Sequence, residues 1–178
     1  WRLAHLARPD AVVSEAALNA PGLAADGTAT ATLQVTLRDW NLQPVSTPVT
    51  FSLRTHRGSQ GEASLGAVTP LGNGMYEIEF IAGNISGLNR FDLVADDGVR
   101  PVTLMPPLDV RLKDARGDFN ADGFVDRLDL PAFIDAFVLD SSRADLTGSS
   151  DPADTAYGIP DDQLDASDLF FLLDLIES

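Results

Sequence analysis

A short stretch of the chain, residues 118–129, carries oxygen-bearing side chains at a regular spacing. Counted from Asp118 as position 1, they fall at positions 1, 3, 5, 9 and 12, and Gly123 falls at position 6. A hard cation such as Ca²⁺ takes about six to eight oxygen ligands, and a glycine at position 6 makes the sharp turn that points them inward. Position 7 supplies a backbone carbonyl. The predicted ligands are Asp118, Asn120, Asp122, Phe124, Asp126 and Asp129.

This spacing is that of an EF-hand calcium loop, with one departure. Position 12 is Asp129 instead of the usual glutamate, so its reach for bidentate binding is shorter and a lower affinity for calcium is expected. The alternative is an acidic loop that is only solvated. Acidic residues placed at random would rarely occupy every ligand position and also leave a glycine at position 6, so we favour calcium.

The negative charge of the chain is concentrated in its last third. Residues 1–117 have 10 basic and 12 acidic side chains, whereas residues 118–178 have two basic and 15 acidic ones, a net charge of −13 out of −15. Such a segment is a poor partner for nucleic acid, and it would fold more readily around a cation. The chain has no cysteine, which excludes disulfides and thiolate metal sites. No stretch approaches the ~20 apolar residues of a membrane span.

The last sixty residues contain an internal repeat. Two apolar stripes with the spacing i, i+3, i+4, i+7 start at Leu130 and Leu169 and predict two amphipathic helices, at 129–137 and 168–176. Each stripe follows an aspartate that can serve as position 12 of a loop. Two such short helices cannot bury their stripes alone, so we expect them to pack against each other.

The second loop is predicted to contain an insertion. Thr147 and Asp161 are 14 positions apart where positions 3 and 5 of a loop are two apart, so 12 inserted residues lie within 148–160. Asp162 replaces the glycine of position 6, and aspartate tolerates positive φ better than most residues. The predicted ligands are Asp145, Thr147, Asp161, Gln163, Asp165 and Asp168. Two alternatives stay open. Asp151 or Asp154 takes the place of Thr147, or the site has decayed and keeps only Asp161, Asp165 and Asp168.

Two loop–helix units without an entering helix resemble a type I dockerin, over about residues 117–177. The resemblance implies calcium in both loops, folding upon calcium binding, and docking onto cohesin domains through the helix faces. In that family, partner choice often rests on loop positions 10–11, here Arg127-Leu128 and Ala166-Ser167. The first pair departs from the Ser-Thr type pair common in the family, so the partner is a cohesin-like or another surface protein. The alternative is a module that only clamps the chain end.

Before residue 113 the sequence alternates with period two, which is typical of half-buried strands. Clear strands are expected at 30–38, 49–54, 76–80 and 91–95, and weaker ones at 12–18, 99–104 and 109–112. Turns rich in Gly, Asn and Asp separate them. About seven short strands predict an immunoglobulin-like β-sandwich, here without the disulfide of antibody domains.

Several short motifs in this part resemble bacterial Ig-like domains of the invasin/intimin type, over roughly residues 12–105. They are Asp26-Gly27-Thr28, Pro48-Val49-Thr50-Phe51, Gly74-Met75-Tyr76 and Ile81-Ala82-Gly83. The resemblance implies a spacer or adhesive module outside the cell. Trp40 stands where that family has a turn of small residues. We expect it to fold against its own domain, the alternative being an exposed contact residue.

The predicted organisation is a mainly β chain with a small α-helical end. It comprises the end of a preceding region (1–10), an Ig-like β-sandwich (11–112), a polar linker (113–117) and a dockerin-like domain of two EF-hand-like calcium loop–helix repeats (118–178). Trp1 is neither an initiator methionine nor the start of a signal-peptide layout, which indicates a piece of a longer protein.

The predicted function is a non-catalytic, calcium-stabilised docking or anchoring region of a secreted or surface bacterial protein. Weak calcium sites fill only where calcium is plentiful, which favours the outside of the cell. His5 and His56 are too few and too far apart for a multi-histidine metal site, and no local motif supports a catalytic triad of Ser52, His56 and Glu62. The alternative is an accessory region of an extracellular hydrolase whose β-sandwich binds carbohydrate.

Overall fold

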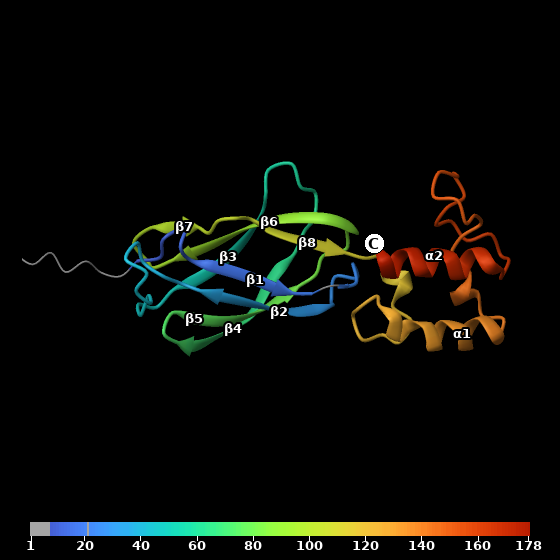
Figure 1. Cartoon of the computed structure of the whole chain (residues 1–178), viewed down its shortest axis with the longest axis horizontal. Coiled ribbons are helices and arrows are strands. Elements are labelled where there is room, and N and C mark those ends of the chain that lie inside the picture. The colour runs from blue at the N-terminus through green and yellow to red at the C-terminus, as the bar shows by residue number, and fades with distance from the viewer. Residues whose placement is uncertain (1–7, 21) are drawn as a thin grey trace, which may run out of the picture.

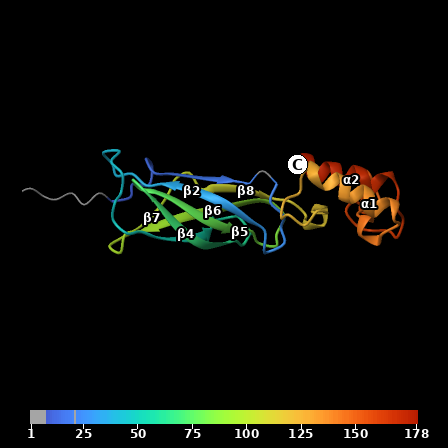
Figure 2. The ribbon, with the colours of Figure 1, turned by 90° about the horizontal axis from the view of Figure 1, so that it is seen from below.

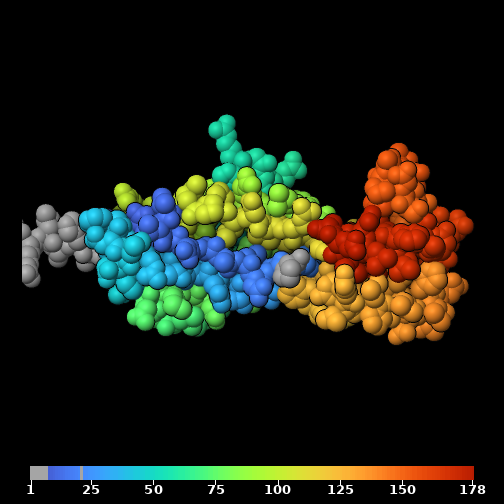
Figure 3. All heavy atoms as spheres, viewed as in Figure 1, coloured from blue at the N-terminus to red at the C-terminus, as the bar shows by residue number. Residues whose placement is uncertain are grey.

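The computed structural model describes residues 8–20 and 22–178. The predicted end of a preceding region, residues 1–10 with His5, is therefore described only from Arg8. A β part and a small helical part follow each other along the long axis of the molecule (Figures 1 and 2). Figure 3 shows that the two parts meet without a gap on the face in view.

Two antiparallel sheets form the β part. One has the strand order β1-β2-β5-β4, and in the other β6 pairs with β3 on one side and with β7 and β8 on the other. The strands are β1 (Glu15–Asn19), β2 (Thr30–Thr36), β3 (Thr50–Thr55), β4 (Ser64–Gly72), β5 (Met75–Ile81), β6 (Gly87–Asp96), β7 (Pro101–Thr103) and β8 (Leu108–Leu112). The Ig-like sandwich predicted from the alternation is thus the observed architecture of two facing sheets.

The core of the sandwich comes from the inward-facing residues of both sheets. Leu33 on β2 lies opposite Ile78 on β5, and both are buried. Phe80 on β5 meets Phe91 on β6 across the two sheets, with ring centroids 5.9 Å apart. Side chains of a strand alternate between two faces, so the residues between these point to solvent.

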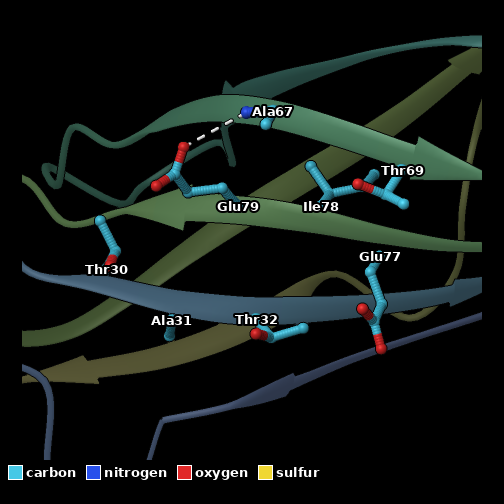
Figure 4. A pocket seen from close by; sticks show the side chains of 8 residues that line it. All are labelled: Thr30, Ala31, Thr32, Ala67, Thr69, Glu77, Ile78 and Glu79. Atoms are coloured by element: carbon cyan, nitrogen blue, oxygen red, sulfur yellow. Dashed lines mark hydrogen bonds between the residues drawn. The ribbon is translucent and has the colours of Figure 1, made fainter.

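One strand, β4, was not predicted from the sequence. It contains Gly66, Pro70 and Gly72, residues that are depleted in strands, and its register slips between Leu65 and Val68. It is an edge strand, where proline and bulges are tolerated. A hollow of about 330 Å³ lies on the solvent-facing side of β2, β5 and β4. The side chains that line it are drawn in Figure 4, where Glu79 Oε2 accepts a hydrogen bond from the Ala67 N–H at 3.3 Å.

The expectation for Trp40 was wrong. Its side chain is 67% exposed instead of folded against the sandwich. It lies in the tight loop between β2 and β3, where Leu42 adopts a positive φ of 63° and Asp39 accepts hydrogen bonds from the N–H groups of Asn41 and Gln43. The Asp39 carboxylate therefore holds the turn of this loop.

The helical part contains α1 (Leu130–Val138) and α2 (Ala166–Glu177), with short 3₁₀ turns η1 (Ala115–Gly117), η2 (Arg127–Asp129) and η3 (Ser142–Ala144). Both predicted helices are present. Their shared core consists of Phe119, Phe133, Ala144, Leu146, Phe171 and Leu172. The prediction that the helices bury both apolar stripes was only partly right, because Ile134 is 52% exposed and Leu169 is also exposed.

The segment predicted as a polar linker, 113–117, is packed between the two parts. Lys113 is only 6% exposed, and its N–H donates to the Leu23 carbonyl at 2.9 Å. Its ammonium group donates to the Ile176 carbonyl at the end of α2, at 2.5 Å, where a cation complements the helix dipole. Burial lowers the pKa of Lys113, and the nearby charge of Arg111 adds to this effect.

The first loop itself pairs with the sandwich. The Val125 N–H donates to the Gly22 carbonyl at 2.6 Å, and the Ala24 N–H donates to the Gly123 carbonyl at 2.9 Å. A Cβ on Gly22 would lie 2.8 Å from the Val125 carbonyl oxygen, so this approach requires glycine. The Val125 side chain is fully buried and belongs to the core of the sandwich. The two parts are therefore joined as one body.

Because the two parts share a core, a destabilising substitution in the first loop should also lower the stability of the sandwich. Val125→Ala should destabilise the chain by about 2 kcal/mol, because it empties a fully buried site. In a Trp1→Phe background, denaturation followed by Trp40 fluorescence should show the loss in the sandwich. Val138→Ala, at a site that is 76% exposed, is the matched control and should change little. A shift confined to the helical circular dichroism signal would contradict a common core.

Candidate metal centre

The first loop is closed by the carboxylate of Asp129, which is fully buried. Its Oδ1 accepts hydrogen bonds from the N–H groups of Phe119 and Asn120 at 2.7 and 3.0 Å, and its Oδ2 accepts one from Asp126 at 2.8 Å. Position 12 thereby ties together three other positions of the loop. Burial raises the pKa of Asp129, the negative charge of Asp118 raises it further, and the three backbone hydrogen bonds oppose the shift.

Asp118, at position 1, holds the middle of the same loop. Its two carboxylate oxygens accept hydrogen bonds from the N–H groups of Asp122 at 3.2 Å and Gly123 at 2.9 Å. Gly123 has a φ of 87°, in the left-handed region that favours glycine. Asp126 is the N-cap of the 3₁₀ turn η2, where its side chain accepts a hydrogen bond from the Leu128 N–H. The Asp129 side chain accepts one from the Asp126 N–H, which completes a capping box.

The second loop repeats these contacts in spite of its insertion. Asp168 Oδ1 accepts from the N–H groups of Leu146 and Thr147 at 2.7 and 3.0 Å, and its Oδ2 accepts from Asp165 at 3.0 Å. The Asp145 carboxylate accepts from the N–H groups of Asp161 at 3.1 Å and Asp162 at 2.8 Å. Each bond has its counterpart in the first loop. Asp145 and Asp168 are therefore structurally equivalent to Asp118 and Asp129.

The same equivalence holds at the turn and at the helix start. Asp162 has a φ of 64°, as the glycine of position 6 would, so aspartate does take the left-handed conformation here. Asp165 caps α2 by accepting from the Ser167 N–H, and Asp168 completes a capping box. The predicted gap between positions 3 and 5 is thus where the structure places the extra residues.

The insertion is anchored at its base and along one side. The Thr147 hydroxyl, which is buried, donates to the Ser149 carbonyl at 2.9 Å and accepts from the Gly158 N–H at 2.8 Å. Asp151 and Asp154 accept hydrogen bonds from backbone N–H groups within the insertion, at Ala153 and Ala156. Thr147 and the two alternative ligands are therefore engaged in holding the insertion.

Tyr157 attaches the insertion to α2. Its ring meets Phe171 with centroids 4.9 Å apart, and its hydroxyl donates to Asp174 Oδ2 at 2.5 Å. The guanidinium of Arg116 reaches the Gly158 carbonyl at 2.9 Å and lies 5.4 Å from the centre of the Phe171 ring. Burial, together with the hydrogen bond to Asp174 and the charge of Asp174, raises the pKa of Tyr157 to about 12.

The chemistry of the donor set fits a hard cation. Each loop offers four carboxylates, an amide or hydroxyl at position 3 and a carbonyl at position 7, all of them oxygen donors. A carboxylate has about four lone-pair sites. Asp118 accepts two hydrogen bonds and keeps sites on both oxygens, whereas Asp129 accepts three and keeps capacity only on Oδ2. Position 12 can therefore bind a cation through one oxygen, consistent with weaker affinity.

The carboxylates are not gathered into a cluster in this structure. Within residues 8–20 and 22–178, no group of three or more His, Cys, Asp or Glu side chains has the arrangement of a metal site. The buried aspartates serve backbone N–H groups, and the exposed Asp122 and Asp161 accept from their neighbours Asn120 and Gln163 at 2.9 and 3.1 Å.

Arg143 contacts the first loop, which was not predicted from the sequence. Its guanidinium donates to the Asp118 carbonyl at 2.7 Å and lies 4.7 Å from the centre of the Phe119 ring. It therefore fixes the start of the first loop from the segment that leads into the second. The one signal in the sequence is that Arg143 is a basic residue in a strongly acidic segment, and Arg127 shares that property.

An apolar groove lies between the helices. It has a volume of about 300 Å³ and is lined by Phe133, Ile134, Phe137, Asp165, Ala166 and Leu169. Leu128, at position 10–11 of the first loop, is also exposed. Ile134 and Leu169, which the helices do not bury against each other, thus lie in one groove.

The attachment of the insertion gives a test by pH. Tyr76→Phe leaves Tyr157 as the single tyrosine, and its tyrosinate absorbance should appear at about pH 12. The raised pKa favours the protonated phenol in the folded chain, so its stabilisation is present below the ordinary value of about 10 and is lost as the pH rises through about 12. Titration near pH 10 in folded Tyr76→Phe would show that the contact with Asp174 does not exist.

Comparison with known proteins identifies the family of the β part. A family model described as Invasin, domain 3 matches residues 10–100, about half of the chain. No curated protein matches. No helix in the described part of the chain is both long and apolar enough to cross a membrane.

Three solved structures match part of this chain. The Yersinia pseudotuberculosis adhesin InvE is 24% identical with a TM-score of 0.45, and the match covers 57% of this chain and 26% of that chain. The Escherichia coli adhesin FdeC is 18% identical with a TM-score of 0.43, covering 59% and 33%. The Lin-41 filamin domain is 20% identical with a TM-score of 0.40, covering 59% and 96%. The matched region thus spans a quarter to a third of the two adhesins.

Proposed function

Because this chain belongs to the Invasin domain 3 family of bacterial Ig-like domains, we propose that its β-sandwich is a spacer or adhesion unit of a secreted or surface protein. The sandwich, residues 11–112, carries no predicted catalytic constellation. His56, the histidine of the rejected triad, is paired with Asp92 at 2.6 Å. Serving as a rigid spacer agrees with the close junction at residues 113–117.

Residues 118–178 act as a calcium-binding, dockerin-like module in this proposal. The observation that carries it is the repetition of one hydrogen-bond pattern around Asp118 and Asp129 and again around Asp145 and Asp168. Chance acidity would not place these carboxylates at equivalent positions on either side of an insertion. The segment has a net charge of −13, and Ca²⁺ would neutralise part of it.

The residues that would hold calcium follow from their positions. In the first loop they are Asp118, Asn120, Asp122, Asp126, Asp129 and the carbonyl of Phe124. In the second they are Asp145, Thr147, Asp161, Asp165, Asp168 and the carbonyl of Gln163. Positions 9 and 12 cap the 3₁₀ turn η2 that runs into α1 in the first loop, and they cap α2 itself in the second, so a cation that tightens either loop also fixes the start of the helical segment behind it.

The paired helices then offer a docking surface. The apolar groove between α1 and α2 fits a partner that inserts apolar side chains, and Leu128 is a further exposed apolar residue of the module. We propose a cohesin-like or another surface protein as that partner. Loop positions 10–11, Arg127-Leu128 and Ala166-Ser167, would contribute to its choice.

Calcium titration of the full chain tests the metal. Calorimetry should show about two sites with dissociation constants on the order of 10⁻⁴ to 10⁻³ M, the range of extracellular modules. Asp129→Asn and Asp168→Asn should each remove one site, because each takes away the charge at position 12. Asp135→Asn, the same charge change on the exposed surface of α1, is the control. Binding that is absent, or equally reduced in all three variants, would refute the proposal.

Docking has its own test. A panel of cohesin domains should bind the full chain in Ca²⁺ and lose it in a chelator. Ile134→Asp, which puts a charge into the groove, should weaken binding at least about tenfold, since it opposes apolar burial. Val138→Asp makes the same change on α1 outside the groove and should have little effect. Equal losses in both variants would rule out this surface, and binding of no cohesin would refute a cohesin-like partner.

A further inference from the structure

We propose that the outer face of the β3-β6-β8 sheet binds an anionic polysaccharide. This basic face is defined by the exposed or half-buried residues Arg54, His56, Arg57, Leu88, Arg90 and Arg111. It lies on the sandwich, away from both loops, and goes beyond the function proposed above. In a chain of net charge −15 that has only 12 basic side chains, this gathering of four arginines is unexpected.

The strand register places these residues on one face. Arg54 on β3 lies opposite Asp92 on β6, and on the other side of β6 Arg90 lies opposite Asp109 and Leu88 opposite Arg111. Directly opposed residues of antiparallel strands point to the same face. The alternate residues Phe91 and Leu93 of β6 are buried in the core, so the basic set faces outward.

The acidic side chains of this face are already used. Arg90 makes a bidentate pair with Asp109, with N–O distances of 2.5 and 3.0 Å, and this hydrogen bond lowers the pKa of Asp109. Asp92 is 2.6 Å from the His56 ring nitrogen. The guanidinium groups of Arg54, Arg57 and Arg111 have no hydrogen-bond or ion-pair partner among the residues that the structure describes. Three cations are thus available to a ligand.

A hollow of about 220 Å³ lies within the basic face. It is lined by His56, Arg57, Gly58, Ser59, Leu88 and Arg90, at the foot of the projecting loop between β3 and β4 (Figure 1). The loop is braced at its start, since the His56 N–H donates to the Arg90 carbonyl and the Arg90 N–H donates to the Ser59 hydroxyl, both at 2.9 Å. Pockets for whole small ligands are usually about 300–1,000 Å³, so this one holds a single group of a longer ligand.

The chemistry of the face favours a chain of repeated anionic groups. Guanidinium groups form bidentate hydrogen bonds with carboxylates and with oxyanions of similar geometry. Arg54 on β3 and Arg111 on β8 lie on opposite sides of β6 and are offset along it, opposite Asp92 and Leu88, so a linear polyanion can cross the face diagonally from one to the other. The distant acidic segment opposes this little, since exposed charges are screened beyond about 8 Å at physiological salt.

Other polymers fit less well. The basic face contains no Phe, Tyr or Trp side chain, and both nucleobase binding and most protein interfaces rely on such aromatic anchors. Its one exposed aliphatic residue is Leu88. A polysaccharide with carboxylate or sulfate groups needs cations and little apolar area, which is what this face provides.

Binding of the full chain to three probes tests the proposal: polygalacturonate, dextran sulfate and uncharged dextran. We expect one or both polyanions to bind at about 0.15 M salt, more weakly as salt rises, and uncharged dextran not to bind. The carboxylate and sulfate probes distinguish the two sources of charge. Binding of dextran sulfate should be the same in Ca²⁺ and in a chelator, and polygalacturonate is tested in the chelator alone because Ca²⁺ cross-links it, so failure here is separate from failure of the calcium site.

Substitutions locate the site. Arg57→Glu and Arg111→Glu should each weaken binding roughly tenfold, since each removes a charge-assisted contact. Arg57→Lys keeps the charge but loses the fork, and should give an intermediate loss. Arg100→Glu, an exposed arginine outside the face, is the matched control and should change affinity less than about twofold.

Three outcomes would overturn the proposal. They are no polyanion binding by a folded chain, an Arg100→Glu loss equal to that of Arg57→Glu, and salt-sensitive self-association that Arg57→Glu abolishes while no polysaccharide binds. The last would assign the basic face to the acidic segment of a second copy. Unchanged thermal unfolding of the variants confirms that they fold, as expected for exposed positions.

Discussion

The helical end of this protein depends on two buried carboxylates that serve backbone N–H groups. Asp129 and Asp168 each accept three hydrogen bonds from their own loop, and together these close both loops and start both helices. A buried carboxylate without such partners would be costly. Because the same arrangement survives a 12-residue insertion in one repeat, it is the arrangement, and not the loop length, that defines the repeat.

The closure of the first loop also determines how the module meets the sandwich. Once Gly123 and Val125 are held, their backbone groups pair with the β1–β2 connection and the valine side chain enters the sandwich core. Lys113 adds a bond to the last turn of α2. A cation that tightened the first loop would therefore also stiffen the junction between the helical part and the sandwich.

Much of this architecture could be predicted from the residues. Alternation revealed the strands that have one buried face, and ligand spacing revealed both loops, including the interrupted one, because such patterns are local. The edge strand β4 was missed because its glycines and proline are tolerated only without a neighbour on one side. The exposure of Trp40 and Ile134, and the packing of residues 113–117, depend on surfaces that meet only in the folded chain.

The contacts of Arg143 and the residues of the basic face also could not be predicted from the sequence. Arg143 reaches the first loop from 25 residues away, and the basic face draws on three strands that are far apart in sequence. Spacing along the chain cannot reveal such groupings, whereas it does reveal a loop whose ligands are all local. Groupings of residues that are close in sequence could therefore be predicted, and groupings assembled by tertiary structure could not.

The central claim is that two equivalent loops hold calcium. Crystals of the full chain grown with Ca²⁺ would test it most directly through anomalous scattering. The account predicts two peaks, one beside Asp118 and Asp129 and one beside Asp145 and Asp168. No peak at either loop, with calcium present at several millimolar, would contradict it.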